Sequence, residues 1–172
     1  MHDEQSQENY QGSGMEERAT IYNNTFDGCN VGITLSPRLV ILNNLFSHLA
    51  KCALVRGDFL ATGVEQPVID HCLFFGNAAS YSAGQIPGTH HLIDQDPLYL
   101  DRVNHTLQAS SPCVNAGTAT YSHAGEKLFS MAPSEYAGGA PDLGANEYGA
   151  SGPVTGRELP REFMIGQFVV RP

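Results

Sequence analysis

The sequence predicts an all-β fold in which short parallel strands stack into a solenoid of about three coils. The first observation behind this prediction is composition: charged residues make up only 16% of the 172 residues, while 18 Gly and 10 Pro provide for many turns. Low charge and frequent turns favour compact β structure over helices, because exposed helix faces are usually rich in Lys and Glu. The second observation is a sequence block that recurs along the first half of the chain.

The recurring block consists of an apolar residue, a polar bend and a returning Phe. Its copies are 21–26 (IYNNTF), 41–46 (ILNNLF) and, more loosely, 69–74 (IDHCLF). Stacked coils would place Ile21, Ile41 and Ile69 above one another in the core, as parallel strands do. Asn tolerates the left-handed backbone of a tight bend, so Asn24 and Asn44 are expected to form a hydrogen-bonded ladder that the third block interrupts.

A further strand is predicted in each coil, because 31–35 (VGITL) aligns with 52–56 (CALVR). Gly57 to Pro67 then supplies the extra residues that separate the second block from the third. The competing interpretation is an antiparallel sandwich, which also has short apolar strands between Gly and Pro turns. The matched order of the blocks favours the solenoid.

The organisation of the chain follows from these blocks. Residues 1–18 are polar and unpatterned and are predicted to be a flexible leader. Residues 19–149 form the coils and a closing segment, with 76–88 expected to be a loop rich in small residues. Residues 150–172 form a tail that fits one more edge strand, from apolar residues at 163–165 and 168–170.

Cysteines and histidines give little support for a zinc or redox site. The four cysteines (Cys29, Cys52, Cys72 and Cys113) form no C-x-x-C pair, and buried free thiols are expected because three lie in apolar runs. The histidines form no H-x-x-x-H pattern, which argues against zinc.

The formal net charge of −9 excludes nucleic acid as a favourable partner, since such a surface repels polyanions. No apolar run has the length of a membrane span. The first residues lack the apolar stretch of a signal peptide.

Three later stretches stand outside the repeat: 96–99 (DPLY), 107–117 (LQASSPCVNAG) and 141–148 (PDLGANEY). In this order they resemble the closing sequence of the pectate-lyase-like superfamily. The resemblance implies a right-handed single-stranded parallel β-helix with an irregular C-terminal closing segment, and an extracellular or cell-surface bacterial protein. It also implies a structural role for Asp142 and Glu147. It does not select an activity, because this fold carries lyases, hydrolases, epimerases and non-enzymes.

A polysaccharide lyase of this superfamily needs a cation to neutralise a uronate carboxylate and a base to remove the adjacent proton. The best matching residues are Lys51 and Arg56 on the second coil, with His90, His91 and Asp94 one turn on. Lys51 or a histidine would be the base and Arg56 the neutralising group. The alternative is that the cations end strands in solvent and the histidines form an exposed strand face.

The sequence predicts no cofactor, and a calcium site is the alternative. Asp94, Asp96 and Asp101 offer several carboxylate oxygens on a short stretch, as Ca²⁺ prefers. The alternative for Asp96, which precedes Pro97, is a turn cap.

Three functions remain open from sequence. The favoured one is a non-catalytic or incomplete C-terminal portion of a carbohydrate-associated β-helix protein that binds polysaccharide; the others are a uronate-specific polysaccharide lyase and a structural or adhesion solenoid. The first coil would leave apolar residues uncovered at one end. Self-association is the favoured cover, ahead of a returning C-terminal segment or missing upstream coils.

Overall fold

The computed structural model describes residues 18–57, 60, 63–149, 164–165 and 169–170. The predicted leader lies outside this part, apart from Arg18, and so does most of the tail. The described chain is all-β, with one short 3₁₀ turn at Pro133–Glu135. The prediction of parallel sheets is confirmed, and the antiparallel sandwich is excluded as the arrangement of the repeated blocks.

Successive strands enter three parallel sheets in turn, and one passage through them is called a coil below. The first coil contains β1 (Thr20–Tyr22), β2 (Thr25–Asp27) and β3 (Val31–Leu35). The second contains β4 (Val40–Leu42), β5 (Leu45–Ser47) and β6 (Cys52–Arg56). The third contains β7 (Val68–Asp70) and β8 (Leu73–Phe75). The next strand, β9 (Leu92–Ile93), pairs in parallel with β8.

Equivalent residues of the blocks are register partners. Ile21 pairs with Ile41, and Ile41 with Ile69, in the sheet of β1, β4 and β7. Phe26 stacks on Phe46 with ring centroids 4.9 Å apart, and Phe46 stacks on Phe74 at 5.1 Å. These columns fill the interior, so each coil covers the next with the same kind of side chain.

The bend between the first two strands of each coil has a left-handed residue, as the Asn pattern predicts. Asn23, Asn43 and His71 have φ of 50°, 55° and 47°. The predicted ladder is also present, because Asn44 Oδ1 accepts hydrogen bonds from the backbone N–H (3.0 Å) and the side-chain amide (3.2 Å) of Asn24. Asn side chains therefore join one coil to the next in the interior.

The third coil continues further than the sequence indicated. Residues 79–82, within the predicted loop, carry backbone hydrogen bonds to β6, with Ser80 O accepting from Leu54 N–H at 3.0 Å. Tyr81 forms a parallel bridge with Leu54. Small residues such as Ala and Ser hide this strand position from a hydrophobicity pattern, although their backbones still pair.

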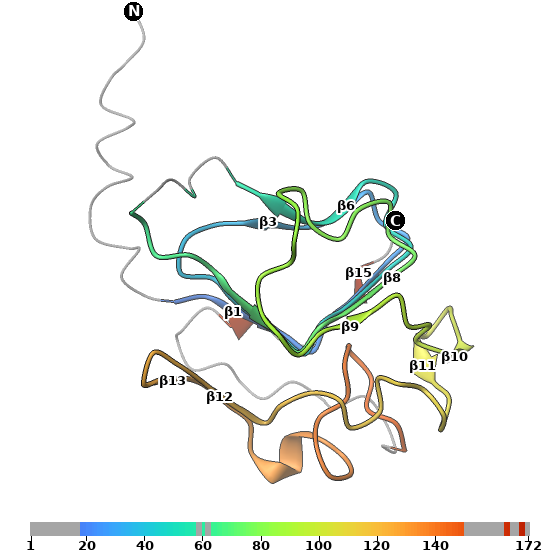
Figure 1. The fold of residues 1–172 in the computed structure, drawn as a ribbon. Coiled ribbons are helices and arrows are strands. Elements are labelled where there is room, and N and C mark those ends of the chain that lie inside the picture. The colour runs from blue at the N-terminus through green and yellow to red at the C-terminus, as the bar shows by residue number, and fades with distance from the viewer. Residues whose placement is uncertain (1–17, 58–59, 61–62, 150–163, 166–168, 171–172) are drawn as a thin grey trace, which may run out of the picture.

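The closing segment, residues 94–149, covers the outer faces of two of the three sheets. It contains β10 (Tyr99–Asp101), β11 (Thr106–Leu107), β12 (Thr120–His123) and β13 (Glu126–Ser130), paired as two antiparallel hairpins. In Figure 1 it lies on the side of β1 and β9, opposite β3 and β6. Phe129 and Met131 cover Val40, Leu42 and Val68.

A second apolar cluster, also outside the coils, attaches the closing segment to β5 and β8. Leu107, Cys113 and Leu143 pack on Leu45 and Leu73. At this contact Gly144 has φ of 101°, and a Cβ there would lie 2.7 Å from Thr25 Oγ1. The glycine of the closing motif is thus needed for close approach to the first coil.

The C-terminal strands extend the sheets beyond the first coil. β14 (Met164–Ile165) pairs parallel with β1, and β15 (Val169–Val170) pairs parallel with β2. The predicted edge strand in the tail is therefore present as two short strands. At the first coil these two strands pair where a returning C-terminal segment would cover the apolar end. The sequence analysis favoured self-association as the cover, and self-association stays a prediction.

All four cysteines are buried free thiols. This confirms the expectation for Cys29, Cys52 and Cys72, and Cys72 occupies the ladder position that follows Asn44. Burial raises the pKa of the Cys72 thiol to about 12, so the thiol is protonated and packs as a small apolar group.

Candidate functional site

The residues predicted as a catalytic set, Lys51, Arg56, His90 and His91, lie in two separate places. Lys51 and Arg56 stand at the two ends of β6 and are exposed. His90 and His91 precede β9, where the chain bends between two other sheets. No hydrogen bond or ion pair between described residues joins either cation to either histidine.

A different group of polar residues gathers where the histidines lie. β8 and β9 pair Leu73 with Leu92, so two residues earlier His90 stands over His71. Their imidazoles stack with centroids 4.7 Å apart and planes 23° from parallel. Asp70 ends β7 immediately before this bend. Coil stacking therefore brings Asp70, His71 and His90 together, across 20 residues of sequence.

The Asp70 carboxylate is the centre of this group. Its Oδ1 accepts hydrogen bonds from the backbone N–H of His71 (2.8 Å) and of His90 (2.9 Å), and lies 3.1 Å from His90 Nδ1. Its Oδ2 accepts a hydrogen bond from the Tyr121 hydroxyl at 3.0 Å. Both oxygens are thus fixed in position, and the side chain is only 5% exposed.

The charge state of the group follows from these contacts. Burial opposes ionisation of Asp70, but the hydrogen bonds from His90, His71 and Tyr121 outweigh it and hold the pKa of Asp70 below its ordinary value. Burial lowers the pKa of His71 against the opposing charge of Asp70. Burial and the hydrogen bond to Asp70 raise the pKa of Tyr121 to about 12. At neutral pH Asp70 is therefore ionised, while His71 and Tyr121 are uncharged.

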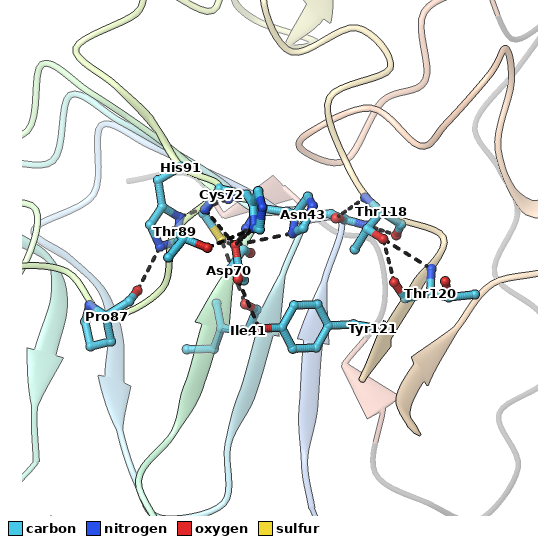
Figure 2. Close-up of polar contacts among 12 residues, drawn as sticks. Ile41, Asn43, Asp70, Cys72, Pro87, Thr89, His91, Thr118, Thr120 and Tyr121 are labelled. Atoms are coloured by element: carbon cyan, nitrogen blue, oxygen red, sulfur yellow. Dashed lines mark hydrogen bonds and ion pairs between the residues drawn. The ribbon is translucent and has the colours of Figure 1, made fainter. Parts of the chain in front are cut away.

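Figure 2 shows how the closing segment reaches this bend. The Asn43 side-chain amide donates to Thr118 O at 2.9 Å, and Asn43 Oδ1 accepts from Thr118 N–H at 2.8 Å. This two-way bond anchors the chain just before β12, which carries Tyr121. On the other side His91 Nε2 lies 2.8 Å from Pro87 O.

A second polar network surrounds Asp27, at the end of β2. Its carboxylate accepts hydrogen bonds from Ser47 (2.7 Å) and from the Arg102 guanidinium (3.1 and 3.2 Å), and contacts ring nitrogens of His48 (2.9 Å) and His105 (3.2 Å). Burial opposes ionisation, but these partners lower the pKa of Asp27 to about 2. The network joins two coils to the β10–β11 hairpin and is structural.

Asp142 and Glu147 also have structural contacts, as the resemblance implied. Asp142 accepts hydrogen bonds from the backbone N–H of Asn115 (2.7 Å) and Tyr148 (2.5 Å). Glu147 accepts from Asp142 N–H (3.1 Å) and Ala137 N–H (3.2 Å). They hold loops of the closing segment to one another, and burial raises the pKa of Glu147 to about 7.

The aspartates predicted to bind Ca²⁺ do not gather into one site. Asp96 Oδ1 accepts from Leu98 N–H at 2.8 Å, which is the turn cap given as its alternative. Asp101 accepts from Val103 N–H at 2.8 Å and from the Asn104 amide at 2.5 Å. Among the described residues, the group with three convergent metal-ligand atoms is Asp70, His71 and His90.

Sequence reasoning named His90 but missed Asp70 and His71 as its partners. The signal was present, since 89–93 (THHLI) aligns with 70–74 (DHCLF) once the repeat is continued for one more coil. Residues 70–74 and 89–93 have no Asn in the bend, and this hides their equivalence to the first two blocks. A register extended by one coil would have placed His90 on His71.

No family model, curated protein or solved structure matches the chain. Within the described residues there is no helix of the length and apolar character needed to cross a membrane.

Proposed function

We propose that this chain is the closing part of a right-handed parallel β-helix protein of the pectate-lyase-like superfamily, and that it binds an anionic, uronate-containing polysaccharide without cleaving it. The handedness rests on the strong right-handed preference of parallel strand connections. The superfamily rests on the closing motifs and on the stacked blocks. Together these support a carbohydrate-associated protein.

The observation that carries the binding proposal is the exposed outer face of the β3–β6 sheet. The closing segment covers the other two parallel sheets. On β3, Thr34 is exposed, and its register partner Val55 on β6 is only half-buried. Lys51 and Arg56 are exposed at the two ends of β6, and the Arg56 guanidinium also donates a hydrogen bond to Leu60 O. A linear polymer lying along β6 would meet a cation at each end.

The net charge of −9 sets the conditions for this interaction. It repels a polyanion at long range, so attraction must come from the two cations at short range and weaken as salt rises. Exposed ion pairs contribute about 0.2–1 kcal/mol each. Loss of both is therefore expected to weaken binding by roughly two- to thirtyfold.

The absence of cleavage in this proposal follows from the same geometry. Lys51 and Arg56 are five steps apart along the extended chain, about 16 Å at roughly 3.3 Å per step. A base and a neutralising cation must reach one sugar unit at the same time. The histidines are on another part of the fold, with Asp70, and do not supplement either cation.

The test is titration of the protein with polygalacturonate and alginate, with neutral dextran as the comparison polymer. The Lys51→Ala/Arg56→Ala variant should lose affinity for the uronate polymers. Lys127→Ala is the matched control, because Lys127 is an exposed lysine on β13, away from this face. Circular dichroism confirms that each variant is folded.

Salt-sensitive binding of the uronate polymers that the double variant loses supports the proposal. Absence of binding by the wild-type protein contradicts it and favours the structural solenoid. Growth of the ultraviolet absorbance of unsaturated sugars during incubation favours the lyase instead.

A further inference from the structure

We propose that Asp70, His71 and His90 form a binding site for a divalent transition-metal ion, with Zn²⁺ as the best-fitting ion. The site goes beyond polysaccharide binding and does not depend on it. Two histidines and one carboxylate are a ligand set that proteins use for zinc and for other borderline metals. The three residues each offer one ligand atom, and these atoms lie within 4.8 Å of one another.

Two of the three ligand distances are close to those around a tetrahedral ion. Ligands bonded at about 2.0–2.1 Å in a tetrahedron lie about 3.4 Å from one another. Asp70 Oδ1 is 3.4 Å from His71 Nδ1 and 3.1 Å from His90 Nδ1. Because the His71 and His90 imidazoles are stacked with planes 23° apart, they would have to tilt out of this stack for both ring lone pairs to point at one ion.

An unsatisfied nitrogen gives a second and independent reason. His71 Nδ1 is buried and has no hydrogen-bond partner, although it is directed toward the Asp70 carboxylate at 3.4 Å. A buried polar atom normally has a partner, because leaving it unpaired costs free energy. A metal ion between His71 and Asp70 would use the lone pair of this nitrogen.

The surroundings hold the ligands in place and leave one side open. Tyr121 donates a hydrogen bond to Asp70 Oδ2 at 3.0 Å, the kind of contact by which an outer residue orients a metal-binding carboxylate. The His90 side chain is 66% exposed and that of His71 is 20% exposed. A fourth ligand would bind on the side of His90. The net charge of −9 also attracts cations.

The alternative without a metal is that Asp70 only caps the two bends. His90 Nδ1 also lies 3.0 Å from Thr89 Oγ1, and the backbone bonds to Asp70 Oδ1 need no ion. The two accounts differ in whether removal of an imidazole changes metal binding, which a titration measures directly.

The test is calorimetric titration of chelator-treated full chain with Zn²⁺, with Co²⁺ absorption as a report on coordination geometry. His71→Asn is the principal variant, because Asn23 and Asn43 occupy the equivalent bends with the same left-handed backbone, so this change preserves the fold. His90→Ala removes the second imidazole. His123→Ala is the control, an exposed histidine in the β12–β13 hairpin.

The wild-type protein and His123→Ala should bind one Zn²⁺ per chain with equal affinity, and Co²⁺ should give the intense visible absorption of a tetrahedral site. His71→Asn and His90→Ala should each bind at least tenfold more weakly while their thermal unfolding stays cooperative. Absence of stoichiometric binding by the wild-type protein, or affinity unchanged in both of these variants, would overturn the proposal.

Discussion

Asn44 Oδ1 accepts two hydrogen bonds from Asn24, which lies one coil earlier, while its own amide donates to Ile21 O (2.9 Å) and Leu42 O (2.8 Å). Asn44 is completely buried. One side chain therefore forms hydrogen bonds with polar groups of two coils inside an apolar core. If it were removed, these buried groups would lose their hydrogen-bond partner.

Asn44→Ala is expected to lower the free energy of unfolding by about 2–4 kcal/mol, because it leaves several buried groups without partners at about 1–3 kcal/mol each. Chemical denaturation measures the loss. Asn30→Ala is the matched control, since Asn30 is exposed, and it should change stability by less than about 0.5 kcal/mol. Equal effects of the two changes would contradict the structural role of the ladder.

Cys72 occupies the next position of this ladder. Its Sγ lies 3.2 Å from Asp70 O and 3.9 Å from Ile41 O, carbonyls equivalent to those that Asn44 contacts. Cys72→Asn should therefore extend the ladder and keep stability within about 1 kcal/mol of the wild type. Cys72→Leu should lose about 1–3 kcal/mol by overpacking. Thermal unfolding ranks them, and a more stable Leu variant would refute this equivalence.

Stability at acid pH depends on Asp27. The ordinary pKa of 3.8 falls to about 2 in the folded chain, so its ionised form stabilises the fold at pH above 3.8. This contribution, about 2 kcal/mol, is lost as pH falls from 3.8 through 2. The stability difference between wild type and Asp27→Asn should shrink over that interval. Asp94→Asn, at an exposed aspartate, is the control variant.

Glu147 acts in the opposite direction. Its pKa rises from 4.5 to about 7 on folding, chiefly because of burial, so its contribution is fully present below pH 4.5 and is lost as pH rises through 7. The stability of the wild type relative to Glu147→Gln should fall by about 1–3 kcal/mol between these pH values. Denaturation curves at several pH values measure this fall; a rise would show that the carboxylate is the favoured buried form.

The repeated blocks allowed much of the fold to be predicted. Ile21, Ile41 and Ile69, and the three Phe residues after them, are partners because apolar residues of one kind at one position can stack only in parallel register. The prediction missed residues 79–82 because three of the four are Ala or Ser, which carry little apolar signal, while their pairing with β6 depends on backbone groups.

The candidate site was less accessible to sequence reasoning. Asp70 and His90 are 20 residues apart, and only the register of β8 and β9 makes them neighbours. Tyr121 joins them from the closing segment, whose path over the sheets no repeat specifies. The sequence groups Lys51 and Arg56 with the histidines because of their chemistry alone. Their distance in space depends on the sheets: β6 lies in one sheet and β9, next to the histidines, in another.

The most direct test of the proposed function is to map the bound polysaccharide on the protein by amide NMR shifts during titration with oligogalacturonate. The account predicts that shifts concentrate on β3, β6 and residues 79–82, and spare the β12–β13 hairpin and the bend at Asp70. Shifts concentrated on the closing segment or around His71 and His90, with none on β6, would contradict it.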